Sequence, residues 1–239
     1  MILVLNLKMN LTKNNIIDYE RLIHNKNVIV MPQYPYLLFF NREGKSYSLG
    51  AQDVSKYSKG SYTGEVCAKG LKSLGVKYCL VGHSERKEYF DEKLEDFRMK
   101  IQNVMDNDMV PIYCISQSEE EYMNDKELKE IENQLEAIPN YLKYIIIAFE
   151  PTWLIGSTDL NIDYDHINKV MVKIKDWLIE RHMNHSIIYG GGVSSDNIDE
   201  LKKLNCVDGF IISSSALDEE EIEKIYKNIN DWLIFFIYI

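Results

Sequence analysis

Residues 144–156 read Tyr-Ile-Ile-Ile-Ala-Phe-Glu-Pro-Thr-Trp-Leu-Ile-Gly, and this stretch decides the fold class. Its β-branched and apolar run, 145–149, is typical of a strand buried on both faces of a parallel sheet that helices cover. Pro151 cannot donate to a strand ladder, so we expect the strand to end at Phe149 with Glu150 at its carboxyl end. Enzymes built from βα units carry their chemistry at that edge.

The residues that follow this strand form a candidate lid. Trp153, Leu154 and Ile155 are apolar residues in a loop, and Gly156 is suited to act as a hinge. A loop of this kind keeps water away from a carboxylate base. The alternative for Glu150 is a surface glutamate beside a packed tryptophan.

The rest of the chain repeats the alternation of strands and helices. Apolar runs predict strands at 2–5, 28–31, 47–52, 77–81, 109–115, 144–149, 186–189 and 207–212. Amphipathic stretches predict helices at 12–24 with Thr12 as its cap, and at 36–40, 65–74, 93–105, 119–137, 164–182, 196–204 and 218–230.

Eight βα units without a linker or low-complexity run predict an α/β protein, a single (β/α)8 barrel domain over residues 1–239. An open doubly wound sheet is the alternative. No G-x-G-x-x-G follows the first strand, which disfavours the open sheet.

Composition limits the classes of partner. The formal net charge of −10 argues against nucleic acid and acidic membranes as partners, and it is compatible with an anionic small-molecule substrate. Hydrophobic residues make up 46% of the chain, enough for a full core. No C-x-x-C pair or His cluster has metal-ligand spacing, so we expect no metal and reduced thiols in a cytoplasmic protein. The four cysteines are Cys67, Cys79, Cys114 and Cys206.

Neither end of the sequence predicts a membrane segment. The first residues lack the basic start and the long apolar core of a signal peptide. The apolar residues 232–239 fall short of the roughly 20 that span a bilayer, and we expect them to pack on a core or on a partner.

Polar residues follow five of the predicted strands, and a barrel gathers such positions at one mouth. They supply a base, an electrophile, a cation and a cradle for an anion. Taken singly, Lys8 fits a solvated lysine, His83 a core histidine and a glycine triplet a tight turn, so the prediction depends on their joint placement. The set comprises Asn6 and Lys8, then Gly82-His83-Ser84-Glu85-Arg86, Glu150, Gly190-Gly191-Gly192 and Ser213-Ser214-Ser215.

With these motifs the chain resembles the triosephosphate isomerase family. The most specific matches are Gly-His-Ser-Glu-Arg at 82–86 and Glu-Pro-Thr-Trp at 150–153. The matches extend from the first strand to the last and also include 6–10, 50–56, 60–66, 74–78, 155–156, 189–191 and 207–210.

The resemblance implies a cofactor-free aldose–ketose isomerase that interconverts glyceraldehyde 3-phosphate and dihydroxyacetone phosphate. In this reading Glu150 moves a proton between adjacent carbons and His83 polarises the carbonyl group. Lys8 and Asn6 hold the substrate and stabilise the enediolate, while Glu85 supports them. The phosphate would bind to the loops that carry Gly156, Gly191, Gly192, Ser213 and Ser214.

The sequence departs from the family mainly on the phosphate side. Gly192 stands where a serine is usual, Ser213-Ser214 where Gly-Gly is usual, and Thr158 where the lid has a glycine. Ser116-Gln117 also replaces the usual Gly-Glu. We hypothesise that the hydroxyl groups at 213 and 214 bind the phosphate in place of a serine hydroxyl group at 192. Two alternatives remain, the same chemistry on a four-carbon sugar phosphate and a barrel that binds without useful turnover.

The resemblance also implies a symmetric dimer formed through loop 53–64. Thr63 of this loop would lie close to Asn6 of the partner subunit and Lys8 of the partner subunit. The tip of the loop, 56–59, is polar and equally fits a solvated loop.

Overall fold

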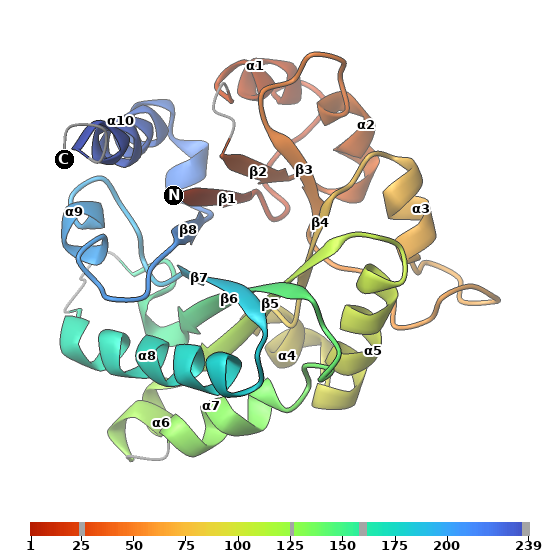
Figure 1. The fold of residues 1–239 in the computed structure, drawn as a ribbon. Helices are drawn as coiled ribbons and strands as arrows, with labels where there is room; N and C mark the ends of the chain where they lie inside the picture. The colour runs from red at the N-terminus through yellow and green to blue at the C-terminus, as the bar shows by residue number, and fades with distance from the viewer. Residues whose placement is uncertain (24–26, 125–126, 158–161, 236–239) are drawn as a thin grey trace.

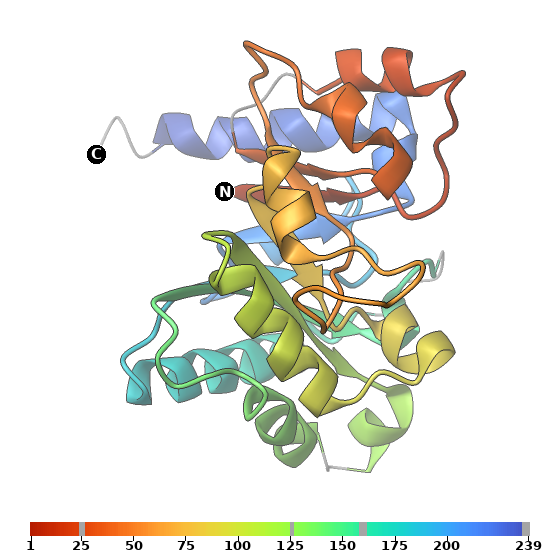
Figure 2. The ribbon, with the colours of Figure 1, turned by 90° about the vertical axis from the view of Figure 1, so that its right-hand side faces the viewer.

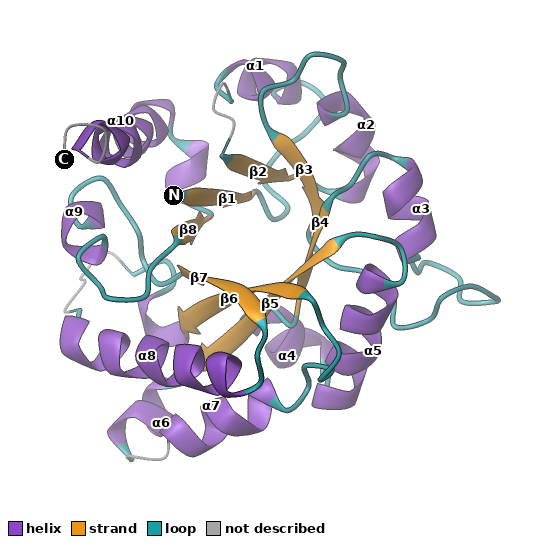
Figure 3. Ribbon diagram, viewed as in Figure 1, coloured by secondary structure: helices purple, strands orange, loops and turns teal. Residues whose placement is uncertain are grey.

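The computed structural model describes residues 1–23, 27–124, 127–157 and 162–235. In these ranges, eight parallel strands pair in sequence order and close into a barrel, with helices outside the ring (Figures 1 and 3). The predicted (β/α)8 barrel is confirmed. The strands are β1 (Ile2–Asn6), β2 (Val28–Met31), β3 (Ser48–Ala51), β4 (Tyr78–Val81), β5 (Val110–Gln117), β6 (Tyr144–Pro151), β7 (Asn184–Tyr189) and β8 (Gly209–Ile212).

The helices follow the strands around the outside of the barrel, as the side view in Figure 2 shows. They are α1 (Ile16–Arg21), α2 (Leu37–Phe40), α3 (Ala68–Ser73), α4 (Ser84–Phe90), α5 (Leu94–Met105), α6 (Glu119–Met123), α7 (Glu127–Leu135), α8 (Tyr164–Glu180), α9 (Ile198–Leu201) and α10 (Glu219–Phe235). Short 3-10 turns occupy η1 (Tyr34–Tyr36), η2 (Thr152–Leu154) and η3 (Ser215–Leu217).

The core has two layers because side chains alternate along each strand. In β6, Ile146 and Ala148 point into the barrel, whereas Ile145 and Ile147 pack outward under the helices. Both faces of the strand are therefore buried, as its continuous apolar run predicted. The barrel interior is filled by Val4, Ile29, Met31, Leu80, Ile112, Cys114, Ile146, Ala148, Ile188 and Ile211.

Strand β6 is longer than predicted and includes Glu150 and Pro151. Its pairing with β7 ends at Phe149, whereas its pairing with β5 continues to Gln117 beside Pro151. Pro151 thus lies where the sheet is paired on one side only, and there the missing N–H of proline is tolerated. Glu150 is held by a regular strand rather than by a loop.

Several helix predictions differ from the structure. The first helix begins at Ile16, because the backbone N–H of Thr12 donates to Asn15 Oδ1 (2.7 Å) and a turn precedes the helix. Thr12 is therefore not its cap. The helix predicted over 119–137 is two helices, α6 and α7. Helix α4 was not predicted, although it begins directly after His83.

The last helix extends further than predicted, to Phe235. It therefore takes in residues 232–235 of the predicted apolar tail, while residues 236–239 lie outside the described part of the chain. Within the described residues, no helix combines the length and the apolar character needed to cross a membrane.

Barrel closure generates the first prediction. Gly209 pairs with Ile2 where β8 meets β1, and a Cβ atom at 209 would overlap the carbonyl oxygen of Ile2. Because the obstacle is backbone, the two strands must separate. We expect Gly209→Ala to lower the free energy of unfolding by about 3 kcal/mol in a urea titration.

The control for this variant is Gly70→Ala in α3, where the nearest atom to a new Cβ, Cys67 Sγ, is 3.6 Å away. Alanine is favoured over glycine inside a helix, so this change should be neutral or stabilising by up to about 1 kcal/mol. Equal stabilities for the two variants would contradict the closure argument.

Candidate active site

Glu150 and His83 meet at the carboxyl end of the barrel. Glu150 is 1% exposed and His83 is 5% exposed. One carboxylate oxygen of Glu150 lies 3.3 Å from His83 Nε2, and the other accepts a hydrogen bond from the backbone N–H of Ser84 (3.3 Å). Strand β6 supplies the carboxylate, and the junction of β4 with α4 supplies both donors. The structure thus brings together the two residues predicted as base and electrophile.

The orientation of the His83 ring follows from helix α4. His83 is the N-cap of this helix, and its Nδ1 accepts a hydrogen bond from the backbone N–H of Glu85 (3.3 Å). A ring nitrogen that accepts this bond carries no proton, so the ring N–H belongs to Nε2. That N–H points toward Glu150, into the site. His83 is therefore set to donate a hydrogen bond rather than to accept one.

Lys8 brings a positive charge to the same mouth. Its backbone is left-handed (φ 45°), and its Nζ lies 2.7 Å from Glu85 Oε1. Asn6 and Gln52 hold this strained conformation, because Asn6 Oδ1 accepts from the Lys8 N–H (3.3 Å) and Gln52 Nε2 donates to the Lys8 carbonyl oxygen (3.0 Å). Gln52 was not predicted as a site residue, although its position at the end of a strand is a signal for it.

Most of the predicted phosphate residues share a small pocket with the base. Lys8, His83 and Glu150 line this pocket. Gly191 does not line it, because its Cα faces the Tyr189 ring and Pro151 instead, where an added Cβ would lie 2.5 Å from Tyr189 Oη. The other lining residues are Ile155, Gly156, Gly190, Gly192, Val193, Ile211, Ile212, Ser213, Ser214 and Ser215.

The described part of the candidate lid is attached to the barrel by its first residues. Thr152 donates from its hydroxyl group to the carbonyl oxygen of Gln117 (3.2 Å), and Leu154 is buried. The Trp153 ring stacks on Tyr122 of α6 at 5.2 Å between centroids. Thr158 lies outside the described residues, so the lid stays a prediction.

A half-buried cation behind the site was also missed. Lys87, in α4, donates from its ammonium group to the carbonyl oxygen of Cys114 (3.1 Å) and to two side-chain oxygens. Burial lowers the pKa of Lys87 to about 8. Burial, and then the charge of Glu150, raises the pKa of the Cys114 thiol. No local pattern marks Lys87 in the sequence, because its partners belong to distant segments.

The fold and the site define a class of protein. A carboxylate base opposite an N–H donor, with a lysine beside them at the mouth of a (β/α)8 barrel, is suited to moving a proton next to a carbonyl group. In the described residues, no group of three or more His, Cys, Asp or Glu side chains is placed to hold a metal ion.

Comparison with known proteins identifies the family. The family model described as triosephosphate isomerase matches residues 1–229. The chain is 37% identical over 233 residues to triosephosphate isomerase of Ureaplasma parvum serovar 3, covering 93% of this chain and 97% of that protein. It is 32% identical over 235 residues to triosephosphate isomerase of Wolbachia pipientis wMel, covering 95% and 93%. The chain belongs to the triosephosphate isomerase family and is an aldose–ketose isomerase.

Proposed function

We propose that the chain interconverts glyceraldehyde 3-phosphate and dihydroxyacetone phosphate, with Glu150 as the base. The observation that carries this proposal is the buried Glu150 carboxylate, 3.3 Å from the Nε2 of a histidine that faces it. A carbonyl oxygen placed on His83 brings the neighbouring carbon within reach of Glu150. Membership of the family disfavours the four-carbon substrate and the inactive barrel.

The proposed reaction balances without a cofactor. Glu150 takes a proton from the carbon next to the carbonyl group, and the electron pair of that C–H bond forms the carbon–carbon double bond of an enediolate. The carbonyl oxygen becomes negatively charged and is stabilised by the N–H of His83 and by the Lys8 ammonium group. The negatively charged oxygen takes the proton of the neighbouring hydroxyl group, whose oxygen becomes the new carbonyl oxygen. Glu150 returns its proton to the carbon that carried the original carbonyl group.

Asn6 and Glu85 act in this proposal by placing Lys8. Asn6 binds the backbone of Lys8, and Glu85 pairs with the Lys8 ammonium group. A cation already in position when charge develops stabilises the transition state without further reorganisation.

We further propose that the phosphate binds between Gly156, Gly192 and the serines after β8. Gly156 and Gly192 have left-handed backbones (φ 72° and 61°) at the pocket, where backbone amides suit an anion. Ser213 and Ser214 also line this pocket, and among the described residues neither hydroxyl group has a hydrogen-bond partner. Both hydroxyl groups are therefore available to a phosphate.

The catalytic proposal predicts the behaviour of Glu150→Gln, which keeps the shape of the side chain and removes its basicity. In a steady-state assay on glyceraldehyde 3-phosphate, we expect kcat to fall about a thousandfold or more with the fold retained. Glu180→Gln, on an exposed carboxylate at the end of α8, is the matched control and should keep wild-type activity. Wild-type turnover of a four-carbon sugar phosphate in preference to the triose would contradict the proposal.

The phosphate proposal predicts an asymmetry between two loops. Replacing both Ser213 and Ser214 by glycine should weaken the binding of inorganic phosphate about tenfold, because the variant lacks two hydrogen bonds to a charged group. Gly192→Ser should change that affinity by less than about twofold and cost about 1 kcal/mol of stability, because residue 192 has a left-handed backbone. Calorimetric titration with phosphate measures the affinities of both variants. A large gain in affinity for Gly192→Ser would refute the hypothesis that Ser213 and Ser214 replace a serine hydroxyl group at 192.

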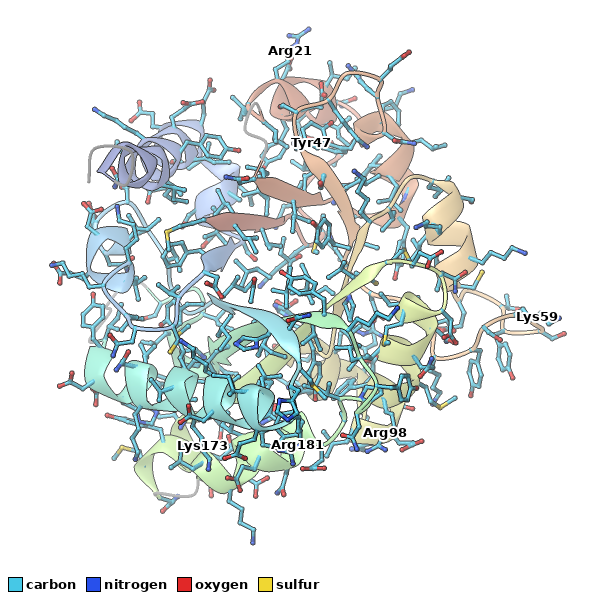
Figure 4. The ribbon with its side chains drawn as sticks, viewed as in Figure 1. Arg21, Tyr47, Lys59, Arg98, Lys173 and Arg181 are labelled. Atoms are coloured by element: carbon cyan, nitrogen blue, oxygen red, sulfur yellow. The ribbon has the colours of Figure 1, made fainter. Side chains whose placement is uncertain are left out.

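We also propose that two copies of the chain form a dimer through loop 53–64. This loop projects from the barrel, with Lys59 near its tip (Figures 1 and 4). Tyr57 and Tyr62 stack at 3.7 Å between centroids and stiffen it. A hollow of about 380 Å³, which Lys8 and His83 of the active site line together with Met9 and Phe90, is the socket that we propose for the loop of the partner subunit. A projection and a socket on one chain suit a symmetric pair.

The dimer proposal predicts the effect of a charge in the socket. Met9 is 86% exposed in the single chain, so Met9→Glu should leave the fold intact and place an unpaired charge in the interface. Sedimentation should give twice the chain mass of 28.0 kDa for the wild type and the single-chain mass for the variant. Met123→Glu, at a methionine that is 73% exposed, is the control and should stay dimeric. A monomeric wild type would contradict the proposal.

Two broader proposals follow from the sequence. Residues 1–239 act as one domain, which the closed barrel supports. The protein works in the cytoplasm, which its four free cysteines support, because unpaired thiols are typical of a reducing compartment.

A further inference from the structure

Lys87 connects three elements behind the active site. Its ammonium group donates to the carbonyl oxygen of Cys114 at 3.1 Å, to Ser116 Oγ at 3.0 Å and to Gln134 Oε1 at 2.8 Å. These acceptors belong to the end of β5 and to α7. Within the described residues, no carboxylate forms an ion pair with Lys87. The half-buried cation is therefore held by three uncharged oxygens, each of which has a definite position.

The acceptors are firmly held themselves. Gln134 donates from Nε2 to the Ser116 carbonyl oxygen (2.7 Å) and accepts the Ser116 N–H on Oε1 (3.0 Å). The Tyr113 hydroxyl group donates to the carbonyl oxygen of Gln134 (2.9 Å). Ser116 lies in register with Glu150 on the neighbouring strand. The Lys87 ammonium group thus binds the segment of β5 that lies beside the catalytic carboxylate.

Helix α4 connects the hydrogen bonds of Lys87 to the catalytic base. Lys87 lies one turn after Ser84, whose backbone N–H donates to Glu150 Oε2, and His83 caps the same helix. A closed path of contacts therefore runs from α4 through Lys87 to β5, across the sheet to Glu150 and back to the start of α4. Movement of α4 relative to β5 changes the distance from the donors to the base.

We propose that Lys87 is a positioning residue, whose ammonium group ties α4 to β5 and so sets the Ser84 N–H and the His83 ring against Glu150. This inference rests on the proposed isomerase function of the site. Lys87 does not line the pocket beside Glu150, so it acts through the groups that do. Misplacement of reacting groups by about 1 Å lowers a rate by up to about a hundredfold.

The three hydrogen bonds that Lys87 donates depend on its charge. A protonated amine has three N–H donors for its three acceptors, whereas a neutral amine has two. Burial lowers the pKa of Lys87 to about 8, so the third bond breaks as the pH rises through that value. The charged or titratable groups that face Lys87 are Cys114 in β5, Glu150 in β6 and Glu121 in α6, and the outer hollow adds Glu88, Glu92 and Lys93.

Activity and stability should respond to this titration in opposite directions. The folded protein holds the pKa of Lys87 below the value of about 10.4 expected for an unfolded chain. Between these two values the unfolded state binds more protons, so the contribution of Lys87 to stability rises with pH. An alkaline loss of kcat near pH 8 caused by Lys87 is therefore not a loss of folded protein.

The experiment compares Lys87→Met and Lys87→Arg in the full chain, with kcat and KM for glyceraldehyde 3-phosphate measured from pH 6 to pH 10. Arginine keeps its charge throughout this range, and the open hollow beside Lys87 has room for the larger group. We expect Lys87→Met to lower kcat about tenfold or more with KM within about twofold. Lys87→Arg should recover most of kcat and lack the fall near pH 8 seen in the wild type.

Lys93→Met is the control, because Lys93 lines the same hollow and is exposed. It should keep the wild-type kcat and pH profile. A folded Lys87→Met with wild-type kcat would overturn the inference, and so would a Lys87→Arg that loses activity near pH 8 as the wild type does. Absence of turnover in the wild type would instead overturn the proposed function, so the two failures are distinguishable.

Discussion

Closure of the sheet between β8 and β1 is the constraint on which the rest of the structure depends. The register that pairs Ile2 with Gly209 brings the last strand back to the first, so the carboxyl ends of all eight strands meet at one mouth. Lys8, His83 and Glu150 are far apart in the sequence and become neighbours only through this closure. The closure requires glycine at 209, because a Cβ atom there would overlap the carbonyl oxygen of Ile2.

The chemistry at the mouth depends on hydrogen-bond direction more than on charge alone. The start of α4 directs the Ser84 N–H at Glu150 and occupies His83 Nδ1, which leaves His83 Nε2 to face the carboxylate. The positive charge of Lys8 is matched by Glu85 on the same helix. One short helix therefore orients the base, the electrophile and the cation, and its own attachment to β5 through Lys87 becomes part of the site.

The sequence was informative where physical signals are local. Apolar β-branched runs mark buried strands, and polar residues directly after them mark the mouth, so the barrel and the positions of Lys8, His83 and Glu150 were predictable. Helix α4 was missed because its first turn reads as a polar motif rather than as an amphipathic stretch. The predicted first helix is too long because Thr12 resembles a cap. In the structure, Asn15 Oδ1 accepts a hydrogen bond from the backbone N–H of Thr12 in a turn.

Contacts between distant segments could not be predicted. Gln52 reaches the carbonyl oxygen of Lys8 across 44 positions, and Lys87 reaches Gln134 across 47. Neither side chain has a local pattern that reveals its partner, since the pairing exists only after the barrel has closed. The same holds for Gly191, whose place in a glycine triplet suggested the phosphate pocket, while its Cα faces Pro151 of β6 as well as Tyr189.

The central claim is that the junction of β4 and α4 presents an imidazole N–H to the catalytic carboxylate. The most direct test is nitrogen NMR of the protein labelled at its histidines, near neutral pH and without substrate, with the His83 signals assigned by their disappearance in His83→Gln. The account predicts a protonated Nε2 and an unprotonated Nδ1 for His83. A proton on Nδ1, alone or together with one on Nε2, would contradict it.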